Sequence, residues 1–146
     1  LQLHHQTGKD DVASVQAAYA ALGVDARVEA FVEDMAAAYA WADLVICRSG
    51  ALTVAELAVV GVASVLVPYP SAVDDHQTLN ARFLVDAGAA VLIPQDKLTP
   101  EVLAAEISKC VAERELVIDR AVRAHSLARP AATDELVSTC LAWEIA

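Results

Sequence analysis

The fold of this chain is decided by residues 43–68, which read DLVICRSGALTVAELAVVGVASVLVP. The short apolar run at Asp43–Cys47 is typical of a strand that is covered on both faces. A turn at residues 48–50 leads into a predicted helix over residues 52–60, which a glycine ends. Ser64–Pro68 follows as a second buried strand. A strand, a helix and a strand joined by short links predict a βαβ unit with parallel strands.

The same alternation extends to both sides of this unit. Before this unit we predict a strand over residues 1–5, a helix over 12–22, a strand over 26–32 and a short helix over 35–41 that Asp34 caps. After it we predict a helix over residues 76–87 and a strand over 90–93. From Thr99 onward the pattern predicts a helical region that is broken near Glu115 and at Pro130. The chain is therefore predicted to be α/β, a Rossmann-like parallel sheet with helices on both faces. Residues 1–129 form its domain, and residues 130–146 a separate C-terminal helix.

Composition excludes several classes of protein. The 146 residues are 57% hydrophobic and 21% charged, which excludes disorder and coiled coil. The formal charge of −10, without a cluster of basic residues, argues against nucleic acid and anionic lipid as partners. Glycine and prolines interrupt the longest uncharged stretch, residues 57–73, so no membrane span is expected. The three cysteines lack metal-ligand spacing, and we expect no metal ion and no cofactor.

Three segments follow predicted strands and carry the polar or apolar groups that a ligand needs. These are Phe31 and Val32, residues 48–56, and a helix start that contains Gln77 and Asn80. In parallel sheets, ligands bind in the crevice beyond the carboxyl ends of the strands. The sequence therefore predicts that the three segments meet at one edge of the sheet.

The middle segment is the most informative. Its candidate binding residues are Arg48, Ser49, Gly50, Ala51, Leu52, Thr53, Val54, Ala55 and Glu56. Small residues here open a helix, whose free N–H groups and partial positive charge suit a phosphate or diphosphate. Glu56 lies one turn further on, where its carboxylate can accept both hydroxyls of a ribose. The alternative is structural, because Thr53 and Glu56 also have the spacing of a capping box. A helix capped earlier, by Ser49, would leave both residues for a ligand.

The two outer segments also have alternative interpretations. Phe31 and Val32 can flank a flat base, or they belong to the hydrophobic core. Gln77 and Asn80 share a helical face and suit sugar hydroxyls, whereas the pair Asp74 and Gln77 has the spacing of a capping box. The sequence contains no Ser/His/Asp triad, phosphate-binding P-loop or GxGxxG motif.

Several longer stretches make the sequence recognisable. They read HQTGK at residues 5–9, FVEDMAAAYAWAD at 31–43, CRSGALTVAE at 47–56, VPYP at 67–70 and DDHQTLNA at 74–81. Together they closely resemble the MurG family of bacterial N-acetylglucosaminyltransferases. The resemblance covers most of residues 4–130 and is looser in the tail.

The resemblance implies a two-domain GT-B architecture, of which this chain matches the C-terminal, donor-binding half. It implies that Val32, beside Phe31, contacts uracil, that residues 51–56 hold the diphosphate with Glu56 on the ribose, and that Gln77 addresses the hydroxyls of GlcNAc. The family's Gly-Gly-Ser loop and its N-terminal domain are expected upstream of Leu1. That domain carries the acceptor site, the membrane-facing patch and the catalytic base, so the resemblance implies that no residue of this chain is catalytic.

By the same resemblance, the expected reaction is transfer of GlcNAc from UDP-GlcNAc to lipid I, giving lipid II with inversion at the sugar. The resemblance also implies a role in cell-wall synthesis at the cytoplasmic face of the bacterial inner membrane. The whole enzyme is expected to attach to that membrane peripherally, through its N-terminal domain only. We expect the chain by itself to be inactive as a transferase. Three alternatives stay open: a donor-binding subunit that works with a separate chain, another UDP-sugar enzyme such as a 2-epimerase, and a Rossmann-like module without nucleotide preference.

Overall fold

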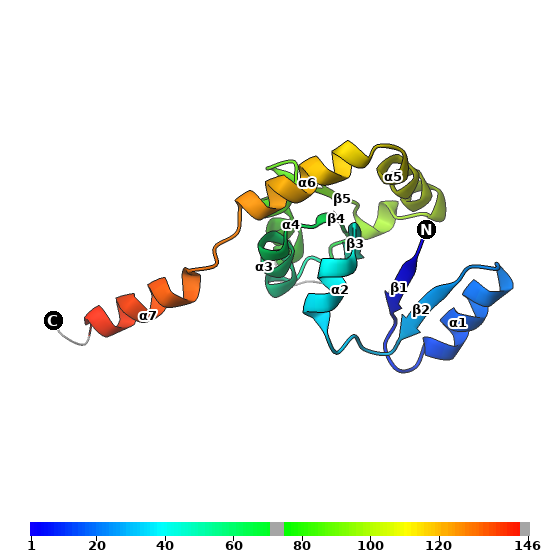
Figure 1. The fold of residues 1–146 in the computed structure, drawn as a ribbon, viewed down its shortest axis with the longest axis horizontal. Coiled ribbons are helices and arrows are strands. Elements are labelled where there is room, and N and C mark those ends of the chain that lie inside the picture. The colour runs from blue at the N-terminus through cyan, green and yellow to red at the C-terminus, as the bar shows by residue number, and fades with distance from the viewer. Residues whose placement is uncertain (71–74, 144–146) are drawn as a thin grey trace. The chain divides into compact units, whose positions relative to one another are not determined.

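The computed structural model describes residues 1–70 and 75–143 of the chain. These residues form two compact units, Leu1–Ala38 and Tyr39–Ala146. Strands and helices alternate in both (Figure 1). The two units are described separately below.

The first unit is a parallel strand pair with one crossover helix. It contains β1 (Leu3–Gln6), α1 (Val12–Ala21) and β2 (Ala26–Glu29). The strands pair in register from Leu3 opposite Ala26 to Gln6 opposite Glu29. Beyond β1, the backbone N–H groups of Thr7 and Gly8 donate to the carbonyl oxygens of Glu29 and Ala30, both at 3.0 Å. These two bonds carry the pairing one step past the strands and fix the start of the segment that follows β2.

The short helix α2 (Met35–Trp41) contains the division between the two units, which falls between Ala38 and Tyr39. Asp34 caps it as predicted, since Oδ1 of Asp34 accepts a hydrogen bond of 2.9 Å from the N–H of Ala37. The prediction that a strand runs to Val32 was too long. The strand ends at Glu29, so Phe31 and Val32 lie in the loop before α2.

The second unit holds a three-stranded parallel sheet and most of the helices. Its sheet has the order β3–β4–β5, formed by Leu44–Cys47, Ala63–Leu66 and Ala90–Leu92. The crossover helices are α3 (Ala51–Val60) and α4 (His76–Val85), which pack against each other. Further along lie a 3₁₀ helix, η2 (Gln95–Lys97), and the helices α5 (Pro100–Ala112), α6 (Arg114–Ser126) and α7 (Ala132–Trp143).

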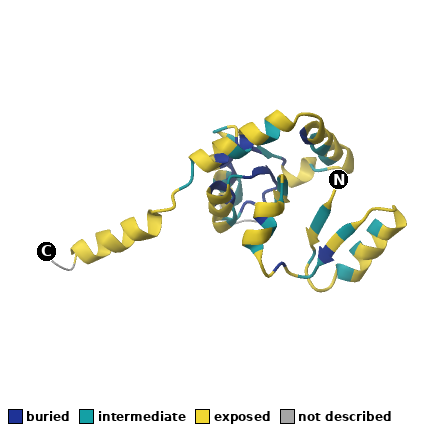
Figure 2. Cartoon of the chain, viewed as in Figure 1, coloured by how far each residue is buried: buried dark blue, intermediate teal, exposed yellow. Residues whose placement is uncertain are grey.

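The core of the second unit is centred on β4, all four residues of which are buried (Figure 2). Leu57 from α3, Leu66 from β4 and Leu84 from α4 are fully buried. Helix α6 contacts both α3 and β4, and an ion pair of 2.7 Å between Arg120 and Glu106 joins it to α5. This packing holds α3 in place beside the sheet, and with it the start of α3, which follows the carboxyl end of β3 along the chain.

The predicted α/β class with parallel strands is confirmed. The expected single sheet is described as two separate parallel sheets, β1–β2 in the first unit and β3–β4–β5 in the second. Helix α7 has no buried residue among those described, and its exposed apolar side chains include Leu136, Leu141 and Trp143.

Candidate functional site

The start of helix α3 leaves backbone donors without partners. Gly50 is the N-cap residue, with φ −61° and ψ 149°, and no side chain in the described part of the chain caps this helix. The first carbonyl of the helix, that of Gly50, accepts from the N–H of Val54 at 2.9 Å. Within the described residues, no acceptor faces the N–H groups of Ala51, Leu52 and Thr53. Three consecutive amide donors at the positive end of a helix form a site suited to an anion.

The helix boundary decides between the two interpretations of Thr53 and Glu56. A capping box requires Thr53 to precede the helix, but Thr53 is its third residue. The capping-box alternative is therefore wrong. The helix begins early, as the ligand interpretation needs, although Gly50 rather than Ser49 is its cap. Glu56 lies one turn inside α3 with an exposed side chain.

The carboxylate of Glu56 is held by a tyrosine from α2. The phenol of Tyr39 donates to Oε2 of Glu56 at 3.2 Å, and Tyr39 is buried. Burial, together with the negative charge of Glu56, raises the pKa of the Tyr39 phenol well above its usual range. The phenol consequently stays a hydrogen-bond donor, and one oxygen of Glu56 is oriented while the side chain remains open to solvent.

Two side chains attach the loop before α3 to helix α4. Ser49 is fully buried, and its Oγ donates to the carbonyl oxygen of Gln77 at 2.8 Å. In return, Nδ2 of Asn80 donates to the carbonyl oxygen of Ser49 at 3.1 Å. The side chains of Ser49 and Asn80 thus fix the backbone that presents the free amide groups. Their predicted contact with a ligand stays a prediction.

Arg48 and Gln77 connect the same loop to the end of β4. Nη1 of Arg48 donates to the carbonyl oxygens of Val67 and Pro68, at 3.2 and 3.1 Å. Its guanidinium carbon lies 5.5 Å from the centre of the Tyr69 ring. Oε1 of Gln77 accepts from the backbone N–H of Tyr69 at 2.9 Å. Among the described residues no acceptor binds Nε2 of Gln77, so this amide group is available to donate to a ligand.

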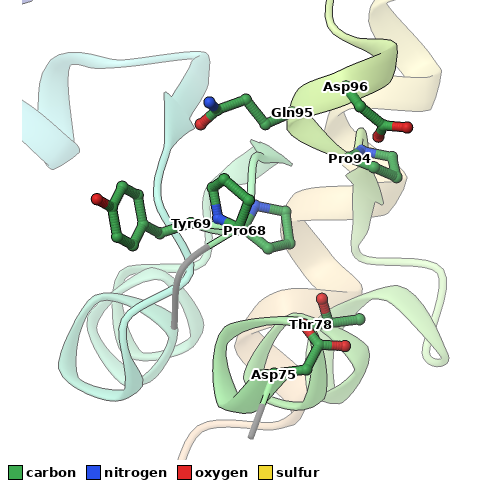
Figure 3. Close-up of a pocket in the computed structure, with 8 residues that line it drawn as sticks. Pro68, Tyr69, Asp75, Thr78, Pro94, Gln95 and Asp96 are labelled. Carbon is green, nitrogen blue, oxygen red and sulfur yellow. The ribbon is translucent and has the colours of Figure 1, made fainter. Parts of the chain in front are cut away.

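A cleft of about 340 Å³ opens beside Tyr69, at the carboxyl ends of β4 and β5 (Figure 3). Its walls are formed by Pro68, Tyr69, Pro70, Asp75, Thr78, Pro94, Gln95 and Asp96. Sequence reasoning did not select these residues. The signal that was present is the Pro-Tyr-Pro run directly after a buried strand, where a parallel sheet places its ligands. Asp74, the cap that the sequence offered for Gln77, lies outside the described residues.

The two candidate residues of the first unit, Phe31 and Val32, differ in how far they are buried. Val32 is buried, as the core interpretation expects, whereas Phe31 is 69% exposed. The backbone N–H of Val32 donates to Oε1 of Gln6 at 2.8 Å. Because Phe31 and Val32 belong to the first unit and the other candidates to the second, their convergence on one ligand stays a prediction.

Among the described residues, no group of three His, Cys, Asp or Glu side chains is placed to hold a metal ion. No helix in the same residues has the length and apolar character needed to cross a membrane.

Comparison with known proteins gives the family. A model of the glycosyltransferase family 28 C-terminal domain matches residues 1–135. The chain belongs to this family. Two similar relatives, from Marinobacter nauticus and Dechloromonas aromatica, both have the name UDP-N-acetylglucosamine--N-acetylmuramyl-(pentapeptide) pyrophosphoryl-undecaprenol N-acetylglucosamine transferase. They are 53% and 54% identical to this chain over 139 residues, which is 95% of it and 38% and 39% of their own lengths.

A solved structure agrees with this family 28 assignment. The crystal structure of Acinetobacter baumannii MurG matches with a TM-score of 0.88 and 48% identity, over 95% of this chain and 42% of that protein. The predicted resemblance to MurG and the GT-B fold are thereby confirmed. The family 28 chain spans about two fifths of the length of the relatives it matches.

Proposed function

We propose that this chain binds the UDP-GlcNAc donor of an inverting N-acetylglucosaminyltransferase that converts lipid I into lipid II. The observation that carries the proposal is the start of α3, where the amide groups of residues 51–53 have no partner among residues 1–70 and 75–143 and lie near a carboxylate held by Tyr39. A diphosphate followed by a ribose matches this order of donors and acceptor. The names of the relatives agree with this substrate class.

The chemistry needs little more from this chain than positioning. In a single displacement, the C4 hydroxyl of the muramoyl sugar attacks C1 of GlcNAc, the bond from C1 to the diphosphate oxygen breaks, and a base takes the hydroxyl proton. Negative charge grows on the departing UDP. The free N–H groups and positive end of α3 stabilise that charge without any reorganisation.

Gly50 provides independent support for a ligand at this helix. Its φ of −61° is open to any residue, and an added Cβ would meet only Oγ1 of Thr53, at an ordinary 3.7 Å. No contact within the described residues therefore excludes a side chain at this position, although glycine is also one of the preferred N-cap residues. A ligand that approaches the backbone closely does require it, because only glycine leaves that space open.

The remaining candidates take distinct roles in this proposal. Nε2 of Gln77 donates to a GlcNAc hydroxyl, while the side chains of Arg48, Ser49 and Asn80 hold the loop. Phe31 and Val32 flank the uracil. The catalytic base, the lipid I site and the peripheral attachment to the cytoplasmic face of the inner membrane belong to residues outside this chain. Residues 1–129 form the donor domain, and α7, within residues 130–146, docks on the acceptor-binding domain.

Calorimetry of the 146-residue chain against UDP-GlcNAc, UDP-glucose and NAD⁺ tests the proposal. We expect binding of both UDP-sugars, tighter for UDP-GlcNAc, and none of NAD⁺. Equal binding of NAD⁺ and UDP-sugars, or binding of neither, contradicts a UDP-sugar site in this chain.

A further inference from the structure

The chain that leaves β4 carries a single backbone donor. Residues 68–70 read Pro-Tyr-Pro, and proline has no backbone N–H, so Tyr69 has the only N–H group of this stretch. That N–H donates to Oε1 of Gln77 at 2.9 Å. A backbone N–H can only donate, so the atom of the carboxamide that faces it is the oxygen. Tyr69 therefore orients the side chain of Gln77 and leaves Nε2 on the free side of the carboxamide.

The main chain of Gln77 is fixed as well. Its carbonyl oxygen accepts from Oγ of Ser49 at 2.8 Å, and Ser49 is fully buried. Gln77 is thus held twice, by Ser49 at the main chain and by Tyr69 at the carboxamide oxygen. Since no acceptor among the described residues binds Nε2, the group that remains for a ligand has a fixed direction.

Arg48 determines where Tyr69 lies. The N–H of Val67 still donates to the carbonyl oxygen of Cys47, at 2.9 Å, but Pro68 has no N–H with which to continue this pairing. Instead, Nη1 of Arg48 donates to the carbonyl oxygens of Val67 and Pro68, at 3.2 and 3.1 Å. The guanidinium carbon also lies 5.5 Å from the centre of the Tyr69 ring, and a cation is attracted to the face of an aromatic ring. Arg48 therefore holds the main chain before Tyr69 and the ring of Tyr69 itself.

We propose that Arg48 and Tyr69 form a positioning pair for the donor sugar: Arg48 holds Tyr69, whose N–H turns the carboxamide of Gln77 so that Nε2 faces a sugar hydroxyl. This inference rests on the proposed function and deepens it. It assigns the direction of a sugar-binding group to two residues that do not need to touch the sugar. Because Arg48 belongs to the loop that leads into α3, the pair also links the diphosphate end of the site to its sugar end.

Calorimetry with UDP-GlcNAc and UDP on the 146-residue chain tests the pair through the ratio of the two affinities, because only UDP-GlcNAc carries the sugar. We expect Arg48→Met to weaken UDP-GlcNAc by roughly tenfold more than UDP, the equivalent of one hydrogen bond. Loss of positive charge alone predicts the opposite change in the ratio, since UDP ends in a free phosphate and carries more negative charge than UDP-GlcNAc. Arg82→Met is the matched control and should keep the ratio, because it removes the same charge from an exposed position on α4.

Two variants of Tyr69 test its ring. Tyr69→Phe is the conservative variant and should keep the ratio, because both the aromatic face and the backbone N–H remain. Tyr69→Ala keeps the N–H and removes the ring on which Arg48 lies, so the ratio should fall, though less than in Arg48→Met. Should Arg48→Met not fold, Tyr69→Ala decides by itself, since the side chain that it removes is 49% exposed.

The outcomes separate this inference from the proposed function. An unaltered ratio in either Arg48→Met or Tyr69→Ala overturns the pair while the donor site stands. An equal loss for both ligands is such a result, and it is the one that a merely structural role predicts. A ratio that rises in Arg48→Met also overturns the pair, because charge alone then accounts for the effect. If the unmodified chain binds neither UDP nor UDP-GlcNAc, the proposed function itself fails.

Discussion

The phenol of Tyr39 donates a hydrogen bond of 3.2 Å to the carboxylate of Glu56, from a buried position on α2 to an exposed one on α3. The two residues are 17 positions apart, on the helices that precede and follow β3. A carboxylate with one oxygen already oriented loses less freedom when it binds a ribose, which lowers the cost of recognition. Tyr39 thus prepares the group that we expect to contact the donor.

Replacing Glu56 by alanine should weaken UDP binding with only a small loss of stability. We expect a decrease of about 1.5–3 kcal/mol in binding free energy, the range for hydrogen bonds to a charged group, measured by calorimetry. The melting temperature should fall only slightly, because Glu56 does not cap α3 and the one hydrogen bond of its side chain within the described residues is the bond from Tyr39. Glu135→Ala, on the exposed face of α7, is the control for loss of one negative charge. A lower melting temperature with unaltered UDP affinity would show that the carboxylate is structural.

Tyr39→Phe tests the same pair from the other side. The variant keeps the buried ring and removes only the donor, so UDP binding should weaken by about 0.5–1.5 kcal/mol. In the background of Glu56→Ala the same change should have almost no further effect, because the group that it orients is gone. Fully additive losses in this double-mutant cycle would mean that Tyr39 acts on binding independently of Glu56.

Stability should fall at alkaline pH because the buried phenol of Tyr39 and the half-buried thiol of Cys47 resist deprotonation. Burial raises the pKa of the Cys47 thiol from 9.0 to about 12, and the pKa of the Tyr39 phenol is raised as well. Well below pH 9 both groups are protonated in the folded and the unfolded chain, so pH has almost no effect through them. Above it the unfolded chain releases protons that the folded chain keeps, and the free energy of unfolding decreases.

Urea unfolding at pH 8 and pH 10.5 measures this loss. We expect the decrease to be smaller in Cys47→Ala than in the unmodified chain, whatever the absolute stability of the variant. Cys140→Ala, on the exposed side of α7, controls for removal of a thiol as such. An identical decrease in the unmodified chain and in Cys47→Ala would remove Cys47 from the explanation.

Local pattern predicted the order of the elements and the Asp34 cap, because both depend on neighbours in the sequence. It placed the strand ends too late, since apolar residues such as Val32 and Val67 continue the pattern past Glu29 and Leu66, where the strands end. The sequence pattern did not predict the hydrogen bonds from Tyr39 to Glu56 and from Val32 to Gln6. They join residues 17 and 26 positions apart, and a tyrosine in an alanine-rich helix has the same pattern whether it fills the core or orients a carboxylate.

The two glycines at the ends of α3 should respond to alanine in opposite ways. At Gly50, the loss of a preferred cap residue and the reduced freedom of the unfolded chain roughly offset each other, so stability should change by less than about 0.5 kcal/mol. UDP affinity should fall by about 1–3 kcal/mol, the usual cost of an extra methyl group in a close contact.

Gly61→Ala is the matched comparison. Gly61 has φ +72°, and a Cβ there would lie 2.8 Å from Cβ of His125. The left-handed backbone alone costs about 1–2 kcal/mol with a side chain, so thermal unfolding should shift clearly downward. Comparing both variants by calorimetry and thermal unfolding separates the ligand end of α3 from its structural end. A Gly50→Ala chain with unaltered UDP affinity would contradict close approach of the diphosphate to this backbone.

Two fully buried serines of the second unit should differ in what their hydroxyls contribute. Oγ of Ser49 donates to the carbonyl oxygen of Gln77 at 2.8 Å, whereas Oγ of Ser64 on β4 has no hydrogen-bond partner within the described residues. Ser49→Ala should therefore lower the free energy of unfolding by about 0.5–1.5 kcal/mol. Ser64→Ala removes a buried polar group without breaking a bond, so stability should stay the same or rise.

The same pair of variants reports on the binding loop. Because Ser49 attaches the loop before α3 to α4, its loss should also weaken UDP binding, while Ser64→Ala should leave UDP affinity unaltered. Urea unfolding and calorimetry on both variants give the two readouts. If Ser49→Ala lowered stability but kept UDP affinity, the amide groups of α3 would hold their places without this attachment, and the helix alone would be sufficient to present them.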